Sequence, residues 1–341
     1  MYRKILSLLL CVLLFSLAGC RSSKEVNNES SEPIPSEPEV VYYTNPLTGI
    51  ENLEDESIAK RRPVAIMVNN ISVAQKVQTG LSKADVVYET EVEGGITRLM
   101  AVFQDITAVE KIGTVRSARY AYVDLAMGHK AVYVHHGQDE TYCRPHLKDT
   151  QTFALGTNNA GVRVKNGLSY EHTLYGYGEK LWKNLIKRGF DLKLKNSDNW
   201  QTFADAETSV TYENVANTVN VPFSYGYKTV FKYDAESGKY VRYFNDTKRT
   251  DYYTGDPVKF KNVFVLLTSI TDYPDGKHRK VALEGGKGYY CVNGTYTPIK
   301  WSKGSASSKI VFTNEDGTPL VVNQGNSWVC LKSKVFKATF E

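Results

Sequence analysis

The spacing of apolar residues along the chain changes character near residue 204. Before that point, short continuous apolar runs alternate with patterns of helical period, which is typical of a mixed α/β domain. The expected strands there are 64–68, 86–88 and 131–134, and the expected helices are 117–127 and 178–188. Leu99–Phe103 and Lys111–Val115 are predicted to pair with each other as a hairpin.

After residue 204 the period of the pattern becomes two. Short alternating segments are separated by turns such as Asp275-Gly276, Asn293-Gly294 and Asp316-Gly317, which are strong hairpin signals. The sequence therefore predicts an α/β or α+β domain over residues 42–203. A β-rich domain, either a sandwich or a barrel-like sheet, is expected over residues 204–341.

A secretory signal precedes these domains. Residues 1–19 carry Arg3 and Lys4 in front of an apolar run from Ile5 to Phe15, which is too short to span a bilayer. Leu17-Ala18-Gly19-Cys20 has the form of a bacterial lipobox, so we expect Cys20 to become a lipid-bearing N-terminus. Residues 20–41, rich in Ser, Glu, Asn and Pro, are predicted to be a disordered tether. The predicted location is the outer face of the cytoplasmic membrane.

Composition and charge exclude some classes of partner and cofactor. The formal net charge of +5 over 341 residues is too small to indicate nucleic-acid binding. No pair of cysteines has the spacing of a structural zinc site, and no phosphate-binding loop lies between a strand and a helix, so we expect neither a metal nor a cofactor. If a disulfide forms, Cys291 and Cys330 on late β-type segments are the expected pair.

The densest polar cluster within the apolar strands lies between residues 89 and 136. Glu89, Glu91 and Glu93 alternate, so an extended chain would place all three on one face. Arg98 enters the next strand, and two further arginines flank the start of the helix predicted at Ser117. Guanidinium groups beside a helix N-terminus attract phosphate, sulfate or carboxylate. The residues predicted to bind a ligand are Glu89, Glu93, Arg98, Arg116, Arg119 and His135. The alternative is that these acids and arginines simply pair in a structural network.

Other chemistry has weaker support. Adjacent residues of a strand point to opposite faces, so His135 and His136 are a poor pair of metal ligands. Cys143 lies near histidines in sequence only, and Glu89 with Glu91 has a tolerable spacing for an inverting glycosidase. No catalytic residue is assigned.

The chain resembles the YerB-like lipoproteins of Gram-positive bacteria, a family of two domains of unknown function. The stretches that carry the resemblance are 45–49, 62–68, 84–98, 111–119, 133–135, 172–175, 253–256 and 262–265. The family pattern has Asn where Thr173 stands. The resemblance implies a surface location and a two-domain layout, and it implies no reaction.

A looser similarity links the arginines to the LytR-CpsA-Psr envelope phosphotransferases, in which such residues grip a polyprenyl pyrophosphate. Ser117 stands where that family has an Asp, which argues against metal-assisted transfer. We expect a non-enzymatic lipoprotein that binds an envelope glycan, an anionic polymer or a wall-assembly protein. The alternative is an enzyme that acts on a wall polymer or a phosphorylated lipid-linked precursor, with Glu89 or Glu93 as base.

Overall fold

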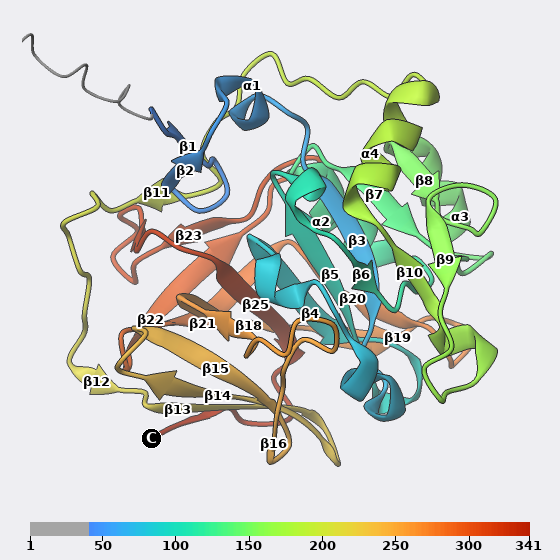
Figure 1. Ribbon diagram of the computed structural model, residues 1–341. Coiled ribbons are helices and arrows are strands. Elements are labelled where there is room, and N and C mark those ends of the chain that lie inside the picture. The colour runs from blue at the N-terminus through green and yellow to red at the C-terminus, as the bar shows by residue number, and fades with distance from the viewer. Residues whose placement is uncertain (1–40) are drawn as a thin grey trace, which may run out of the picture. The chain divides into compact units, whose positions relative to one another are not determined.

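An eleven-stranded sheet lies at the centre of the fold, and both parts of the chain contribute strands to it (Figure 1). The computed structural model describes residues 41–341, which form one unit. The predicted signal peptide, Cys20 and residues 20–40 of the predicted tether lie outside the described residues. Across the sheet the strands are β12 (Asn214–Val215), β22 (Thr295–Ser302), β21 (Gly285–Val292), β18 (Asn262–Thr268), β25 (Ser327–Ser333), β4 (Val86–Glu91), β5 (Thr97–Phe103), β3 (Val64–Asn69), β7 (Val132–His135) and β8 (Thr152–Ala154), with β23 (Val311–Thr313) paired to β22.

Strand β25 joins the two parts of the chain. It pairs in parallel with β18 on one side and with β4 on the other, so that Trp328 lies opposite both Val263 and Val87. Its residues are almost entirely buried, as expected for a strand with neighbours on both edges and layers on both faces. The segments predicted as 42–203 and 204–341 therefore share one continuous sheet.

Two different layers cover the faces of the central sheet. One face is covered by helix α4 (Gly178–Lys187) and by a six-stranded sheet, whose Phe231 packs edge-on against Trp328. The other face is covered by helix α2 (Tyr120–Gly128), by Trp200 from a later loop and by Phe312 from β23. The six-stranded sheet contains β16 (Thr247–Lys248), β15 (Lys239–Phe244), β14 (Tyr227–Asp234), β13 (Thr218–Ser224) and β26 (Thr339–Phe340), with β17 (Lys259–Phe260) paired to β15.

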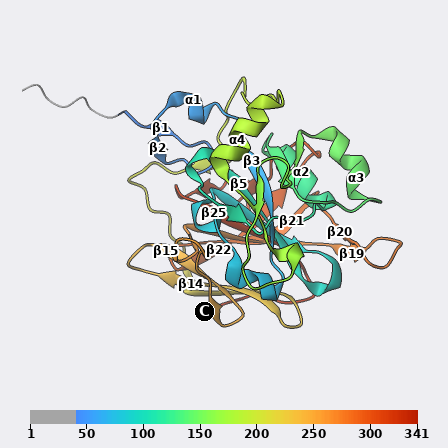
Figure 2. The same cartoon turned by 45° about the vertical axis from the view of Figure 1, so that its right-hand side comes forward.

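Smaller elements lie around these layers. A hairpin of β19 (Ile270–Asp272) and β20 (Arg279–Val281) projects beside the short helix α3 (Cys143–His146), as Figure 2 shows. The remaining elements are β1 (Tyr43–Thr44) with β2 (Glu51–Leu53), β6 (Ile112–Gly113) with β10 (Leu174–Gly176) and β9 (Gly161–Arg163), β11 (Thr202–Phe203) with β24 (Val321–Val322), and helix α1 (Glu56–Ala59). Within residues 41–341, no helix is both long and apolar enough to cross a membrane.

The C-terminal part is rich in strands, as predicted, and strands also outnumber α-helices in the N-terminal part. The predicted hairpin is wrong. The apolar run that contains Leu99 and Phe103 is buried on both faces, and it lies between β3 and β4 rather than beside β6. Helix α2 begins at Tyr120 rather than at Ser117, because Ala118 forms a bridge to Gln138 and is held outside the helix.

The pair named as most plausible if a disulfide formed, Cys291 with Cys330, is not bonded, and no disulfide joins the cysteines of residues 41–341. Cys143, Cys291 and Cys330 are free and buried. Cys291 lies opposite Val263 and Cys330 lies opposite Val265, so strand β18 separates the two strands that carry the expected pair.

Candidate functional site

Most of the residues predicted to bind a ligand gather at one edge of the central sheet. Strands β3, β4, β7, β18 and β25 all run in the same direction, so their carboxyl ends meet at this edge, which we call the carboxyl edge. Helix α2 leads back into β7 and therefore starts at the same edge. In open α/β sheets, ligands commonly bind outside the carboxyl ends of the strands.

Arg98 enters this edge as the second residue of β5, which runs antiparallel to its neighbours. The residue is only 5% exposed, and its Nη1 donates to the carbonyl oxygen of Ser117 at 2.9 Å. Among residues 41–341 no carboxylate forms an ion pair with it. Burial, together with the charges of Arg119 and Arg116, lowers the pKa of Arg98 to about 10, so the side chain stays protonated at neutral pH.

Arg119 and Glu93 form a bidentate ion pair beside Arg98. Arg119 donates from Nε at 2.5 Å and from Nη2 at 3.0 Å to the two carboxylate oxygens of Glu93. Burial alone would raise the pKa of Glu93, but the hydrogen bonds and charge of Arg119 outweigh it and leave that pKa below its ordinary value. Glu93 is therefore ionised and bonded to Arg119; its charge also acts on Arg98, with which it forms no ion pair among the described residues.

Arg116 completes a group that we call the arginine cluster, which consists of Arg98, Arg116 and Arg119. Its Nη1 donates to the carbonyl oxygen of Glu171 at 3.2 Å and lies 3.6 Å from that residue's exposed carboxylate. Its Nε is buried and has no hydrogen-bond partner within the described part of the chain. The three guanidinium groups thus have fewer hydrogen-bond acceptors around them than they have N–H donors.

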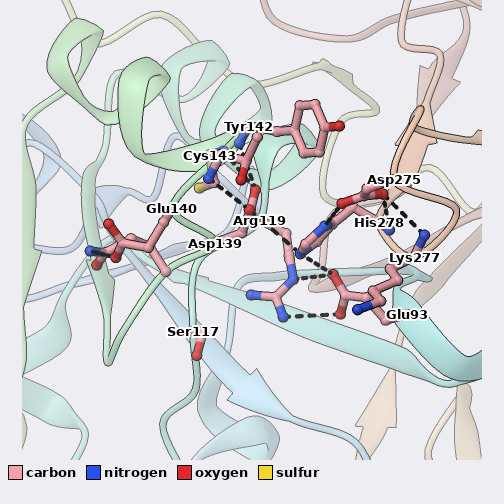
Figure 3. Close-up of polar contacts among 12 residues, drawn as sticks. Glu93, Ser117, Arg119, Asp139, Glu140, Tyr142, Cys143, Asp275, Lys277 and His278 are labelled. Atoms are coloured by element: carbon pink, nitrogen blue, oxygen red, sulfur yellow. Dashed lines mark hydrogen bonds and ion pairs between the residues drawn. The ribbon is translucent and has the colours of Figure 1, made fainter.

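A groove of about 670 Å³ opens beside the arginine cluster, between the N-terminal part and the β19–β20 hairpin. Its lining residues are Glu93, Gly94, Gly95, Arg119, Asp272, Gly276, Lys277, His278 and Arg279. Figure 3 shows how His278 points from the hairpin toward Glu93 and Asp139. Its Nε2 lies 3.7 Å from the Glu93 carboxylate and 3.5 Å from that of Asp139, while its Nδ1 lies 2.5 Å from Asp275.

Aromatic contact also fixes the hairpin against the N-terminal part. The ring of Tyr273, at the hairpin turn, stacks on that of Tyr142 with 3.9 Å between the ring centroids. Asp139 accepts hydrogen bonds from the backbone nitrogens of residues 141, 142 and 143 and so shapes the loop that carries Tyr142. The groove is therefore built jointly by segments far apart in the sequence.

Glu89 does not belong to this site, which corrects its assignment as a ligand-binding residue. It is fully buried under the six-stranded sheet, where it accepts hydrogen bonds from Asn70, Thr97, Thr229 and Trp328. Strand β4 ends at Glu91, and the turn at Glu93–Gly95 directs Glu93 toward the α2 face instead. The alternation that predicted a common face fails because the extended strand stops before Glu93.

The Glu89 carboxylate lies close to a second buried arginine. Burial raises the pKa of Glu89, and the nearby charge of Arg242 opposes that shift. Arg242 is fully buried, donates to Asn70 Oδ1 at 3.1 Å and to Gln78 Oε1 at 3.4 Å, and lies over the ring of Trp328. We call this group the buried polar network. It holds the six-stranded sheet against the central sheet.

His135 lies at the carboxyl edge, but both of its ring nitrogens are occupied. Nδ1 bonds to the carbonyl oxygen of Gly137 and Nε2 to the Thr152 hydroxyl, each at 2.8 Å. Burial lowers its pKa, so the ring is neutral and holds the loop that follows β7. The structure therefore gives His135 a positioning role rather than an open ligand contact.

Four groove residues were not anticipated, namely Asp272, Lys277, His278 and Arg279. The Asp275-Gly276 pair predicted a hairpin there, and the density of charged residues around that turn was the available signal. Burial raises the pKa of Cys143 to about 12, so it is a buried thiol and a poor nucleophile. Within residues 41–341, no group of three or more His, Cys, Asp or Glu side chains has the geometry to hold a metal ion.

Comparison with known proteins adds the family context. Residues 47–191 match the model described as "Protein of unknown function (DUF3048) N-terminal domain", and residues 219–329 match its C-terminal domain. The protein named "Putative lipoprotein YerB" of Bacillus subtilis (strain 168) is 29% identical over 333 residues, which cover 94% of this chain and 92% of that protein. The crystal structure of YerB protein from Bacillus subtilis is similar with a TM-score of 0.76 at 29% identity, covering 88% of this chain and 99% of that chain.

Proposed function

The chain belongs to the YerB-like family of proteins with two domains of unknown function, and from that premise we propose that it is an extracytoplasmic lipoprotein that binds an anionic ligand of the cell envelope. The proposed binding residues are Arg98, Arg116 and Arg119, with the groove as the path by which the ligand reaches them. The proposed anchor is the lipid on Cys20. The relative's name supports lipoprotein character, and the chemistry of the arginine cluster supports the ligand.

One observation carries the proposal, namely the environment of Arg98. A buried guanidinium normally has a carboxylate partner, because an unpaired charge away from water is costly. Arg98 instead has one backbone carbonyl within hydrogen-bond distance, two neighbouring arginines, and the charge of Glu93, whose carboxylate is already paired with Arg119. A phosphate or carboxylate group bound there would supply the missing negative charge, and guanidinium forks suit both groups.

Binding is favoured over catalysis by the state of the two glutamates. An enzyme that used Glu89 as its base would need that carboxylate to face the ligand, and it is sealed beneath the other face of the sheet. Glu93 faces the groove, but its pKa lies below the ordinary value, which makes it a weak base. The proposed role is therefore recognition of an envelope glycan, an anionic polymer or a wall-assembly protein.

The test is calorimetric titration of protein spanning residues 41–341. The ligands are inorganic pyrophosphate, polyprenyl pyrophosphates, teichoic-acid precursors and peptidoglycan fragments. We expect at least one of them to bind, and we expect Arg98→Ala and Arg116→Ala each to weaken that binding at least about tenfold through loss of charge-assisted hydrogen bonds. Arg144→Ala is the matched control, because Arg144 is an exposed arginine near the same edge.

Two outcomes would contradict the proposal. One is the absence of binding by the parent protein to every ligand. The other is unchanged affinity in Arg98→Ala and Arg116→Ala proteins whose circular dichroism spectra show the parent fold. Release of phosphate or cleaved polymer during the same incubations would instead support the enzymatic alternative.

A further inference from the structure

The loop that follows β25 presents apolar side chains to solvent between two lysines. Its sequence is Lys334-Val335-Phe336-Lys337, and Val335 is 80% exposed. The side chain of Lys332, in strand β25 two residues before this loop, is buried and donates from Nζ to the carbonyl oxygens of Ser333 and Phe336. The buried ammonium thus fixes the shape of the loop and holds Val335 outward.

A second segment adds an aromatic ring to this exposed surface. Tyr225, at the turn between β13 and β14, is 95% exposed, and its ring meets that of Phe336 edge-on at 5.2 Å. We call Tyr225, Val335 and Phe336 with Lys334 and Lys337 the apolar tip. Single exposed apolar residues are ordinary on protein surfaces, but two loops that present them together form a patch.

The apolar tip lies at the rim of the groove. Ser224, next to Tyr225, donates from its hydroxyl to the carbonyl oxygen of Gly95 at 2.5 Å, and Gly95 lines the groove. The loop that carries Val335 leaves the carboxyl end of β25, which belongs to the carboxyl edge. The tip and the groove therefore belong to the same edge of the molecule.

We propose that the apolar tip docks on the surface of an anionic phospholipid bilayer. Tyrosine has an apolar body and a polar end and is enriched at the level of lipid headgroups. Lysines beside an apolar pair add attraction to anionic lipids, and the two contributions together are what interfacial binding requires. This docking would turn the groove toward the headgroup layer, and it does not depend on whether the arginine cluster binds a ligand.

The test uses protein spanning residues 41–341, which lacks Cys20 and hence any lipid anchor. Co-sedimentation is measured with vesicles of phosphatidylcholine alone and with vesicles that also contain phosphatidylglycerol. We expect binding to the anionic vesicles that weakens as salt is raised. We expect the double variant Tyr225→Ser/Val335→Ser to weaken it at least about tenfold, because two apolar side chains no longer enter the interface.

The matched control is Ile186→Ser/Val215→Ser, which removes two apolar side chains of 58% and 56% exposure from other parts of the surface. We expect this control to bind vesicles as the parent does. The charge variant Lys334→Glu/Lys337→Glu should lose the preference for phosphatidylglycerol. Equal loss in the control, or parent-like binding by Tyr225→Ser/Val335→Ser, would overturn the proposal.

A second measurement locates the contact directly. Because the three native cysteines of the described region are buried, a thiol-reactive polarity dye can be attached selectively to Val335→Cys or, as control, to Ile186→Cys. Anionic vesicles should shift the emission of the dye at position 335 to the blue and leave that at 186 unchanged. An unshifted dye at 335 would overturn docking through the tip, and so would failure of the parent to bind any vesicle. Loss of vesicle binding only in Arg98→Ala would assign lipid contact to the arginine cluster instead.

Discussion

Two buried arginines, one on each face of the central sheet, show how different environments can surround the same side chain. Burial lowers the pKa of both Arg98 and Arg242 to about 10. Arg242 donates to two side-chain amide oxygens, has the charge of Glu89 nearby and lies over Trp328. Arg98 has one backbone acceptor, the charges of Arg116 and Arg119 nearby, and the charge of Glu93, whose carboxylate is bonded to Arg119.

The difference distinguishes a buried arginine that stabilises the fold from a buried arginine at a candidate binding site. The buried polar network supplies Arg242 with two side-chain acceptors and an aromatic ring, although its Nε has no hydrogen-bond partner within the described residues. In the arginine cluster the Nε of Arg116 is also unpartnered, and Arg119 lines the groove. The proposed anion would therefore reach the arginine cluster, whereas Arg242 is fully buried beneath the six-stranded sheet.

The largest expected effect comes from breaking the buried polar network. Arg242→Ala leaves the carboxylate of Glu89 buried without its compensating charge, so we expect a loss of about 3–5 kcal/mol in the free energy of unfolding. Urea denaturation followed by fluorescence measures the change. Arg249→Ala, at a less buried arginine nearby, should stay within about 1 kcal/mol of the parent. Similar losses for both variants would show that Arg242 has no special role.

A smaller change in the free energy of unfolding is expected from Arg98, on the other face. Arg98→Met removes a buried charge that lacks a carboxylate partner, so the free energy of unfolding should be unchanged or rise by about 1 kcal/mol. Added pyrophosphate should stabilise the parent by mass action and leave this variant unaffected. A loss as large as that of Arg242→Ala, measured by the same denaturation, would show that the two arginines are equivalent.

The smallest expected effect is on the pH dependence of stability, to which Glu89 and Glu93 contribute with opposite signs. The raised pKa of Glu89 means that the folded state holds its proton more tightly, so its contribution to stability is lost as pH rises from about 4.5 through the folded value. The lowered pKa of Glu93 means that its contribution is present above about 4.5 and is lost as pH falls through the folded value.

Glu89→Gln should therefore flatten the decline of stability with rising pH, and Glu93→Gln should flatten the decline with falling pH. Thermal unfolding between pH 3 and 8 separates the two responses. Changes of the same sign in both variants would contradict the assigned environments. Glu54→Gln, at an exposed position with no ion pair in the described chain, serves as the reference.

The sequence alone predicts where strands lie along the chain better than it predicts which strands pair with each other. The strands expected at 64–68, 86–88 and 131–134 correspond to β3, β4 and β7, because continuous apolar runs indicate burial on both faces. The pairing predicted for Leu99–Phe103 is wrong. Nearness in sequence favours a hairpin with the next segment, but a strand buried on both faces has a neighbour on each side, and here these are β3 and β4. Strand β25 could not be placed beside β4 from local pattern, since their pairing spans most of the chain.

The site was predicted in the same uneven way. Arg98, Arg116 and Arg119 come together as expected, since the strand entry and the helix start lie at one edge. Glu89 lies apart from Glu93 because a turn at Gly94 and Gly95 follows the strand. The sequence of two glycines does not show in which direction the chain leaves such a turn. His278 reaches Glu93 only through tertiary packing of the hairpin, for which no local pattern exists.

The position of β25 has a consequence for the order in which the chain can fold. Until residues 327–333 are synthesised and pair, β4 and β18 each expose an edge in the middle of the future sheet. The central sheet therefore cannot be completed until β25, one of the last strands in the sequence, pairs with β4 and β18. Pairings between residues so far apart in the sequence form slowly. While the sheet is incomplete, its open edges can pair with other chains, so aggregation competes with folding until β25 is in place.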